Sequence, residues 1–555
     1  MSNGINPGKN DVLFVPLGGA GEIGMNMSLY GAAGQWLVVD CGVAFGDENS
    51  PGADLLVPDP AFATERRDKI AGIVITHAHE DHIGAVPYLW RLLRRPVYAS
   101  RFACAMLERK LQEAGLADEV PVHEVTPGRP VQIGPFSVEY INITHSIPEA
   151  HILAIRTPAG LVVHATDWKL DPAPLVGPPS NIEALQRLGA EGAIAMMVDS
   201  TNVFVPGEVG SEATLRESLA GLVGRFTGRV AIACFASNVA RVGSIAAAAK
   251  ANGRSASLVG RSMIEITEAA RRCGYLADTP PFLSDQEAAL LPRDRVVFAV
   301  TGSQGEPRSA LARIAAGDHD HVKLGAGDTV VFSSRIIPGN EKAIARVENQ
   351  LARLGVEVVD EHEHFVHVSG HPGRDELARM YGWIKPRIAV PIHGEARHLH
   401  EQARFARECG IEQTIVIENG AVLRLAPNGP TALDRVRTGR LAVDGTRLIP
   451  LEGNVMTARR RVGFSGAAVA TVVLDGKGRL VMDPKITVPG LMDEALDAEA
   501  VEAAVAAIVE AIDHLSKDAR RSDGAVAETA RAAIRRTLKR ELGKRPVTEV
   551  HVMRI

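Results

Sequence analysis

The chain has 555 residues, of which 46% are hydrophobic, 4% aromatic and 23% charged, and its formal net charge is −5. This length predicts about three or four domains, and the weakly acidic balance excludes binding of polyanions over a uniformly basic surface, so any polyanion site must be a local groove. Five scattered cysteines without a Cys-x-x-Cys pair predict reduced thiols and a cytoplasmic location. We expect neither a signal peptide nor a membrane span, because no suitable apolar run is present.

A glycine-rich turn follows the first predicted strand, residues 11–17. Residues 18–24 contain Gly-x-Gly-x-x-Gly, which imitates a dinucleotide-binding fingerprint. That fingerprint requires a helix after the glycines, but further glycines follow and residues 36–39 already predict the next strand. We therefore expect tight turns between strands and no dinucleotide site. Asp40, at the end of the second strand, is expected to orient a metal-bound histidine.

The most informative segment is residues 73–87, where a predicted buried strand (73–75) runs into a predicted helix (83–95). The turn between them carries His77, His79, Asp81 and His82. Neutral imidazoles suit Zn²⁺ and related metals, and a carboxylate adds negative charge. His77 and His79 point the same way in an extended segment, whereas Asp81 and His82 can face a second ion. Two ions about 3.5–4 Å apart are the usual device for cleaving phosphate esters.

The alternative for this segment is a solvated, histidine-rich turn. The ordered spacing directly after a buried strand favours the metal site. The segment resembles the signature motif of the metallo-β-lactamase superfamily.

Two later strands also end in possible ligands. The predicted strand 136–143 ends just before His145, and the strand that begins at residue 161 ends in Asp167. In an α/β sandwich such strand ends converge on one rim, so both residues are expected to join the metal site, with Asp167 able to bridge two ions. His151 and His164 are expected to be structural.

From about residue 210 the chain alternates regularly between strands and helices, which is typical of a parallel sheet. The predicted strands are 230–234, 257–259, 296–300 and 329–332. Small hydroxyl, amide and glycine residues follow each strand, and backbone N–H groups at helix starts bind phosphate well. Two more histidine loops follow, at residues 366–373 and 388–395.

Taken together, the motifs resemble the β-CASP branch of the metallo-β-lactamase superfamily and, within it, the bacterial ribonuclease J family. The ordered ligand set of that branch is complete: His77, His79, Asp81, His82, His145, Asp167 and His393. The motifs of the β-CASP branch are matched by residues 199–201, 369–371 and 391–394. The likeness to the ribonuclease J family rests on residues 17–24, 235–238, 301–307 and 338–341. Ala240 departs from the pattern, since many relatives have histidine there.

The resemblance implies a metallo-β-lactamase αββα sandwich with an inserted β-CASP α/β domain and a small α+β C-terminal domain. The expected boundaries are 1–210 and 376–430 for the sandwich, 211–375 for the insert, 431–454 for a linker that packs back on the sandwich, and 455–555 for the C-terminal domain. In that last domain we predict a hairpin of residues 468–474 and 479–482, helices over 494–515 and 526–542, and a final strand over 547–553.

The resemblance further implies a metal-dependent nuclease for single-stranded RNA, acting 5′→3′ as an exonuclease on 5′-monophosphate ends, with some endonuclease activity, in RNA maturation and decay. Two divalent ions are expected, with Zn²⁺ as the first choice and Mn²⁺ as the alternative. His77, His79 and His145 would hold one ion, Asp81, His82 and His393 the other, and Asp167 would bridge. Asp199 and His371 would assist proton transfer or stabilise charge, and Asp81 is also expected to be catalytic.

The residues expected to contact RNA and its terminal phosphate are Phe235, Ser237, Asn238, Arg261, Asn340, His367, Val368, Ser369, Gly370 and His371. A structural cation such as Ca²⁺ is expected between Asp47 and Asp444, with a solvated acidic turn over residues 47–52 as the alternative. The expected partners are further copies of the chain, as a homodimer or homotetramer, and other ribonucleases or helicases of an RNA-degrading complex, but no membrane.

Two other functions stay open at this point. One is a metallohydrolase for DNA or a small ester, although the long insert with several phosphate-type loops argues against a small ester. The other is a non-catalytic RNA-binding or scaffold subunit, which predicts eroded ligands, whereas all seven are present. The basic stretch 517–545 is expected to be a solvated face rather than an RNA contact.

Overall fold

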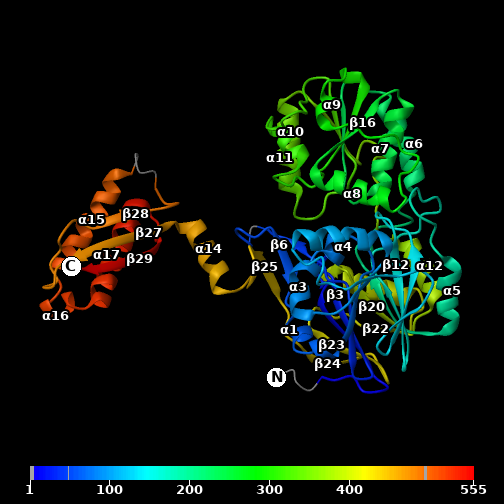
Figure 1. Cartoon of the computed structure of the whole chain (residues 1–555), viewed down its shortest axis with the longest axis horizontal. Helices are drawn as coiled ribbons and strands as arrows, with labels where there is room; N and C mark the ends of the chain where they lie inside the picture. Colours follow the sequence, from blue (N-terminus) through cyan, green and yellow to red (C-terminus); the bar gives the residue numbers. More distant parts are fainter. Residues whose placement is uncertain (1–4, 48, 493–496) are drawn as a thin grey trace. The chain divides into compact units, whose positions relative to one another are not determined.

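The computed structural model describes residues 5–47, 49–492 and 497–555 (Figure 1). The chain forms two compact units, one of residues 1–44 and 57–439 and the other of residues 45–56 and 440–555. Within the described residues no helix is both long enough and apolar enough to cross a bilayer. The two units are described separately below.

The first unit contains a sandwich of two large sheets whose inner faces share one hydrophobic core, to which Phe14, Tyr140 and Leu423 belong. The eight-stranded sheet has the order β24-β23-β1-β3-β4-β7-β8-β9: β1 (Val12–Gly18), β3 (Met27–Ala32), β4 (Gln35–Val39), β7 (Ile70–Val74), β8 (Val97–Ala99), β9 (Val122–Glu124), β23 (Ala421–Ala426) and β24 (Thr431–Arg435). The seven-stranded sheet has the order β10-β11-β12-β13-β14-β20-β22: β10 (Val131–Ile133), β11 (Phe136–Ile143), β12 (Ala150–Thr157), β13 (Gly160–Ala165), β14 (Ala193–Asp199), β20 (Ile388–Ile392) and β22 (Gln413–Thr414).

Late segments of the chain complete both sheets. Strand β23 pairs antiparallel with β1, so that Phe14 lies opposite Leu423, and β20 pairs in parallel with β14. Residues 431–435 form β24, the outermost strand of the first sheet. The sandwich is therefore assembled from chain segments that lie about 410 residues apart in sequence. The strands of the seven-stranded sheet come between them in the chain.

The glycine-rich turn contains strands and no helix, as the sequence predicts. After β1 the chain makes the short strand β2 (Ala20–Gly21), which pairs with β21 (Gly394–Glu395), and then enters β3. The predicted turns between strands are confirmed, whereas a dinucleotide fingerprint would have a helix at this point.

Helices cover the sandwich, and one of them differs from the prediction. They are α1 (Ala61–Thr64), the 3₁₀ turn η1 (Arg67–Lys69), α2 (Glu80–Ile83), α3 (Val86–Leu93), α4 (Arg101–Glu113), α5 (Ile182–Glu191), α12 (Arg374–Ile384) and α13 (Ala396–Glu408). The single helix predicted over residues 83–95 is wrong, because α2 and α3 are separate. The N–H of Ala85 donates to the carbonyl of Cys41 at 2.9 Å, which takes it out of the helical pattern.

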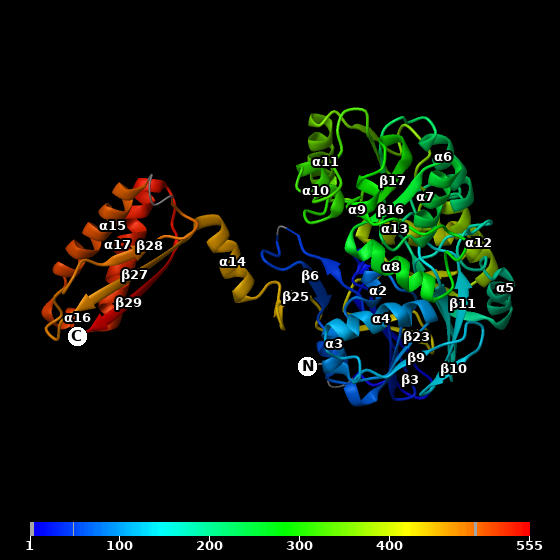
Figure 2. The ribbon, with the colours of Figure 1, turned by 45° about the horizontal axis from the view of Figure 1, so that its top comes forward.

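The chain between β14 and β20 builds a further, five-stranded sheet that is wholly parallel, of order β16-β17-β15-β18-β19. Its strands are β15 (Val230–Ala233), β16 (Ser255–Val259), β17 (Val296–Val300), β18 (Thr329–Phe332) and β19 (Glu357–Val359). Its helices are α6 (Glu212–Val223), α7 (Val239–Ala251), α8 (Arg261–Arg272), α9 (Asp285–Ala289), the 3₁₀ turn η2 (Arg293–Arg295), α10 (Ala310–Ala316) and α11 (Glu341–Arg353). Figure 2 shows α6 and α7 on one side and α10 and α11 on the other, each with its own core. The predicted parallel sheet is confirmed.

A buried ionic network joins this parallel sheet to the sandwich. The fully buried guanidinium of Arg241, on α7, lies 2.8 Å from the carboxylate of Glu212 on α6 and donates to the carbonyl of Ser333 at 2.7 Å. The N–H of Glu212 in turn donates to Asp171, whose carboxylate lies 3.2 Å from the buried ammonium of Lys169. Lys169 and Asp171 belong to the loop after β13, so the network connects both parts of the first unit.

The second unit combines two small sheets with helices. A four-stranded sheet has the order β26-β25-β6-β5, with β5 (Ala44–Phe45), β6 (Leu55–Pro58), β25 (Arg440–Asp444) and β26 (Arg447–Pro450). A three-stranded sheet has the order β28-β27-β29, with β27 (Ala467–Leu474), β28 (Lys485–Thr487) and β29 (Val547–Arg554). Its helices are α14 (Asn454–Ser465), α15 (Ala498–Asp513), α16 (Lys517–Arg520) and α17 (Asp523–Leu542).

Two predicted elements of this unit need correction. The partner of β27 is Lys485–Thr487, whereas residues 479–482 contribute only an isolated bridge between Leu474 and Leu480. The backbone N–H groups of Lys477 and Arg479 bond the Asp475 carboxylate and close a tight turn before regular pairing can develop. Helix α17 begins at residue 523 rather than 526, because the Ser522 hydroxyl caps it. The predicted start of the preceding helix, residues 494–496, lies outside the described residues.

We expect the buried network to be costly to break. Replacement of Arg241 by alanine leaves the Glu212 carboxylate buried without its partner and should lower the free energy of unfolding by about 3–5 kcal/mol. As a control, Arg404→Ala removes the exposed pairs with Glu401 and Glu408 and should cost less than about 1 kcal/mol. Urea unfolding followed by circular dichroism measures both variants. Equal losses would show that the buried network does not stabilise the first unit.

Candidate metal centre

The predicted ligands converge at one edge of the sandwich, where several strands end. They follow β7 (His77, His79, Asp81 and His82), β11 (His145), β13 (Asp167) and β20 (His393). Three groups have ligand atoms within 4.8 Å of one another: His77, His79, His145 and Asp167; Asp81, His82, Asp167 and His393; and Asp167, Asp199, His371 and His393. The first two correspond to the two sets expected from the sequence.

The first set contains three histidines whose ring nitrogens face each other. His79 Nδ1 lies 3.0 Å from His77 Nε2 and 3.1 Å from His145 Nε2. Asp167 Oδ2 lies 3.9 Å from His77 Nε2 and 3.8 Å from His145 Nε2. Burial lowers the pKa of His79 to about 4 and holds the pKa values of the other two histidines well below the usual value. Neutral imidazole is the form that offers a lone pair to a metal.

The second set contains two histidines and two carboxylates. His82 Nε2 lies 3.5 Å from Asp81 Oδ2 and 3.3 Å from Asp167 Oδ1. His393 Nε2 lies 3.3 Å and 3.5 Å from the same two oxygens. Burial lowers the pKa of His393, but the carboxylates of Asp167, Asp199 and Asp81 outweigh burial and raise it to about 10.

Asp167 offers a different carboxylate oxygen to each set. Its Oδ1 is buried and accepts no hydrogen bond from the described residues. A buried carboxylate oxygen without a partner is costly, and a cation removes that cost. Both the donor types and this unpartnered oxygen therefore fit divalent metal ions.

Outer contacts fix the orientation of the histidines. Asp40, whose role the sequence predicts, lies 2.8 Å from His82 Nδ1. The carbonyl oxygen of Gly370 lies 2.6 Å from His145 Nδ1, and the Thr201 hydroxyl lies 2.9 Å from His393 Nδ1. Such contacts set which ring nitrogen faces a metal.

Sequence reasoning missed two residues that contact these ligands. Thr201 belongs to the 199–201 motif, and its hydroxyl contacts His393. The presence of a hydroxyl in that motif is the one sequence feature that could have indicated this contact. Asn26 lies 3.0 Å from His82 Nε2 and donates to the carbonyl of Asp81 at 3.1 Å. No spacing or periodicity distinguishes Asn26 in the sequence.

The backbone adopts an uncommon conformation at three residues of this site. Asp40, Asp167 and His393 have φ values of +62°, +49° and +52°, in the left-handed region. This conformation costs about 1–2 kcal/mol per non-glycine residue. The surrounding sheets must therefore impose it, and it turns each side chain toward the shared edge.

Asp199 and His371 form an ion pair beside the two sets, with 2.7 Å between Asp199 Oδ2 and His371 Nδ1. Burial raises the pKa of Asp199, but His371 and His393 outweigh burial and hold it below the usual value. Burial lowers the pKa of His371, but Asp199 outweighs it, so the pKa of His371 is raised. The His371 ring lies 5.3 Å from that of His145 and 5.4 Å from that of His393. A charged imidazole can therefore serve as a proton donor here.

The residues predicted to bind RNA lie in different environments. Phe235 and Arg261 are exposed at the ends of β15 and β16, and Asn340 donates to Gln304 before α11. Ser369 and Gly370 directly precede His371, and the Ser369 hydroxyl accepts from Asn202 at 2.8 Å. Ser237 and His367 are half-buried, whereas Asn238 and Val368 are buried: the side chain of Asn238 caps α7, and that of Val368 packs in a core.

The two residues of the predicted cation site have protein partners. Asp444 accepts from Arg459 at 2.7 Å and from Arg447 at 3.1 Å, and Asp47 accepts from the N–H of Asn49 at 2.8 Å. Glu48 lies outside the described residues. The groups of described residues that could hold an ion do not include Asp47 or Asp444, and the structural cation stays a prediction.

Comparison with known families covers most of the chain. Residues 35–185 match the beta-lactamase superfamily domain, and residues 227–351 match the beta-CASP domain of ribonuclease J. Residues 355–416 match the Zn-dependent metallo-hydrolase RNA specificity domain, and residues 454–555 match the C-terminal domain of ribonuclease J.

Relatives that match along nearly the whole chain are also described as ribonuclease J. Ribonuclease J of Sinorhizobium meliloti is 43% identical over 550 residues, which cover 98% of each chain. Ribonuclease J of Mycolicibacterium smegmatis is 38% identical, over 95% of this chain and 94% of the relative. A crystal structure of a protein of unknown function from Enterococcus faecalis superimposes with a TM-score of 0.52 at 16% identity, covering 75% of this chain and all of that one. That structure supports the fold alone.

A methyl group at Gly42 should disrupt the metal centre. A Cβ atom there would lie 1.6 Å from the carbonyl oxygen of Asp81, so the turn that carries Asp81 and His82 would have to move. We expect Gly42→Ala to weaken divalent metal binding by about 10- to 100-fold, as loss of outer contacts does elsewhere. Titration calorimetry with Zn²⁺ and Mn²⁺ measures the change.

Gly382→Ala is the matched control, since a Cβ at this helical position meets nothing within 4 Å. It should leave metal affinity unchanged. Wild-type affinity in Gly42→Ala would mean that the turn does not set the ligand geometry.

Proposed function

Because the chain belongs to the ribonuclease J family and is a metal-dependent ribonuclease, we propose that it degrades single-stranded RNA in the 5′→3′ direction, favouring 5′-monophosphate ends, with some endonuclease activity. Its role would be RNA maturation and decay. The observation that carries this proposal is the complete double ligand set with the Asp199–His371 pair beside it. A non-catalytic scaffold would have no need of such a set.

The proposed ligands of two divalent ions, Zn²⁺ or alternatively Mn²⁺, follow the two sets of the site. His77, His79 and His145 would hold one ion, Asp81, His82 and His393 would hold the other, and Asp167 would contribute to both. When bound, such ions supply positive charge to the phosphoryl group and lower the pKa of an attacking water.

The protein's own groups prepare the reaction. Asp40 fixes the His82 ring, so that His82 and the catalytic Asp81 present their donor atoms together. The Asp199 carboxylate raises the pKa of His371 and orients its ring through Nδ1. His371 Nε2 then donates a proton to the oxygen that leaves phosphorus. Burial of the surrounding side chains strengthens each of these electrostatic interactions.

The terminal phosphate is proposed to lie against the loops at the carboxyl ends of the parallel strands. Ser369 and Gly370 adjoin His371 directly, while Ser237, Asn340 and Arg261 come from neighbouring loops, and the ring of Phe235 and the half-buried His367 add contacts. Asn238 and Val368 would act through the cap of α7 and the core. Backbone N–H groups at such helix starts favour an anion.

The wider setting is also a proposal. A cytoplasmic homodimer or homotetramer, supported by the C-terminal domain, would work with other ribonucleases or helicases. A structural Ca²⁺ between Asp47 and Asp444 would have to share these carboxylates with the protein partners that both already have.

The activity is tested on one single-stranded RNA prepared with a 5′-monophosphate or a 5′-triphosphate, and on DNA of the same sequence. With Zn²⁺ or Mn²⁺, we expect mononucleotides to be released first from the monophosphorylated RNA, and the activity to be lost in His79→Ala and after chelation. Gel analysis of end-labelled substrate measures this. Internal fragments without end preference would contradict the exonuclease, and cleavage of DNA alone would favour a DNA-directed enzyme.

Loss of the proton donor should slow chemistry more than binding. His371→Ala and Asp199→Asn are each expected to reduce kcat on RNA about 10²- to 10⁴-fold while both retain their metal ions, because general acid catalysis contributes about that factor. Single-turnover kinetics and metal analysis check this. An unchanged kcat in either variant would remove the pair from the mechanism.

A further inference from the structure

A second polar junction lies where α4 of the sandwich meets the end of α8 of the parallel-sheet region. Its central residue is Glu149, which precedes β12 in the same loop as His145. Glu149 Oε2 accepts the backbone N–H of Phe102 at 2.6 Å, and Oε1 accepts the hydroxyl of Tyr275 at 2.9 Å. One carboxylate thus links three segments: the loop of His145, the first turn of α4 and the residues after α8.

The backbone at Glu149 is held in an unfavourable conformation. Its φ is +57°, in the left-handed region that non-glycine residues rarely adopt. Such a conformation persists only where the surroundings impose it. The two hydrogen bonds of the carboxylate provide that constraint, since both depend on the direction in which the side chain leaves the loop.

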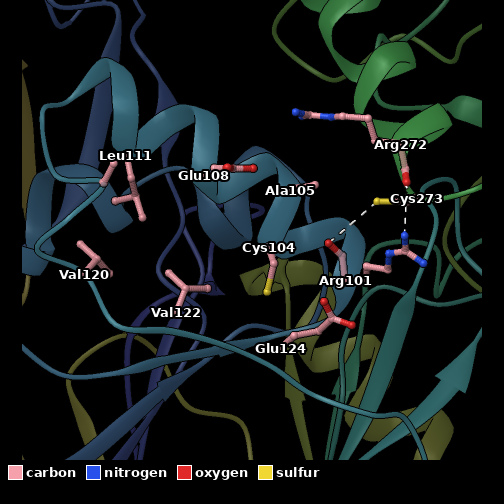
Figure 3. A pocket seen from close by; sticks show the side chains of 11 residues that line it. Arg101, Cys104, Ala105, Glu108, Leu111, Val120, Val122, Glu124, Arg272 and Cys273 are labelled. Atoms are coloured by element: carbon pink, nitrogen blue, oxygen red, sulfur yellow. Dashed lines mark hydrogen bonds between the residues drawn. The ribbon is translucent and has the colours of Figure 1, made fainter.

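Few other contacts hold the two helices together. Figure 3 shows the Arg101 guanidinium donating to the carbonyl of Arg272, at 3.3 Å, and the thiol of Cys273 at 4.0 Å from the carbonyl of Arg101. Farther along, Arg109 pairs with Glu265. A cavity of about 540 Å³, lined by residues of both helices, opens beside these contacts. Besides these polar interactions, the rings of Phe102 and Tyr275 meet edge to face with 6.3 Å between their centroids, a contact that Tyr275→Phe would keep.

We propose that Glu149 is a positioning residue for RNA cleavage, which holds the parallel-sheet region in register with the loop of the metal ligand His145. The inference rests on the proposed function, in which an RNA chain contacts both the metal centre and the loops of the parallel sheet. The Tyr275 bond fixes one side and the Phe102 bond the other. Without this link, RNA bound at the parallel sheet would reach the metal centre less often in a reactive position.

A purely structural role is the competing explanation, in which Glu149 only satisfies an N–H group of α4. That N–H is one of the first-turn donors that a helix leaves unpaired, and the hydroxyl of Ser100 does not cap it. The two roles are separable, because Tyr275→Phe removes the link to the parallel-sheet region and leaves the bond between Glu149 and Phe102 in place.

The test compares Tyr275→Phe, Glu149→Gln and the double variant on 5′-monophosphorylated single-stranded RNA. Tyr275→Phe should lower kcat/KM about tenfold and leave affinity for Mn²⁺ unchanged, while the thermal midpoint falls by no more than about 2–4 °C, as expected for the loss of one hydrogen bond. Glu149→Gln should show at least the same loss, and the double variant no more than Glu149→Gln alone, because both changes break one link. Tyr88→Phe, a half-buried tyrosine of α3, should match wild type.

Three results would overturn the inference: an unchanged kcat/KM in Tyr275→Phe, losses that multiply in the double variant, or a parallel loss of Mn²⁺ affinity. The last would show that the effect reaches the ligands themselves. If Glu149→Gln fails to fold, Tyr275→Phe alone still decides. A wild-type protein that does not cleave RNA would defeat the proposed function, whereas an active wild type with a fully active Tyr275→Phe would defeat only this inference.

Discussion

The structure depends on one shared carboxylate, that of Asp167, which lies between two groups of buried side chains. Five imidazole rings and the Asp81 carboxylate surround it, with several nitrogen–nitrogen and nitrogen–oxygen separations between 3.0 and 3.5 Å. Polar groups packed this closely away from water are unfavourable without compensating charge. The pKa values of the histidines are lowered in the first group and raised in the second. The first group has three rings around one carboxylate, whereas the second has two rings between two carboxylates. The site is therefore built for cations, and its two halves differ in hardness.

The sandwich delivers these side chains because its strands end at a common edge and because outer residues fix each ring. Asp40, Thr201 and the carbonyl of Gly370 each contact the ring nitrogen that faces away from the shared carboxylate. Gly370 lies next to His371, so the loop that carries the proposed proton donor also contacts the ring of His145. A shift of this loop would therefore move both side chains at once.

The convergence of these histidines and aspartates could be predicted from sequence because each stands at a strand end with a recognisable spacing, and because the ordered set as a whole resembles a known branch. The errors have tertiary causes. The helix over residues 83–95 is broken by a bond from Ala85 to Cys41, and the pairing partner of β27 lies beyond the predicted hairpin. Glu149 gave no signal, since its two partners lie 47 and 126 residues away and neither belongs to a motif. Sequence patterns report local geometry and strand ends, whereas contacts between helices of different sheets leave no periodic trace.

The pairing of β1 with β23 has a consequence for protein synthesis. A domain that is continuous in sequence can fold on the ribosome as soon as its last residue emerges. Here the first strand of the sandwich has its pairing partner, residues 421–426, only late in synthesis. The N–H of His393 also donates to the carbonyl of Gly19, next to that first strand. The nascent chain therefore exposes His77 to His82 for most of translation without the histidine that completes the second ligand set. The full ligand set, and with it the proposed nuclease activity, would therefore form only after the late strands have been made and the sandwich has closed.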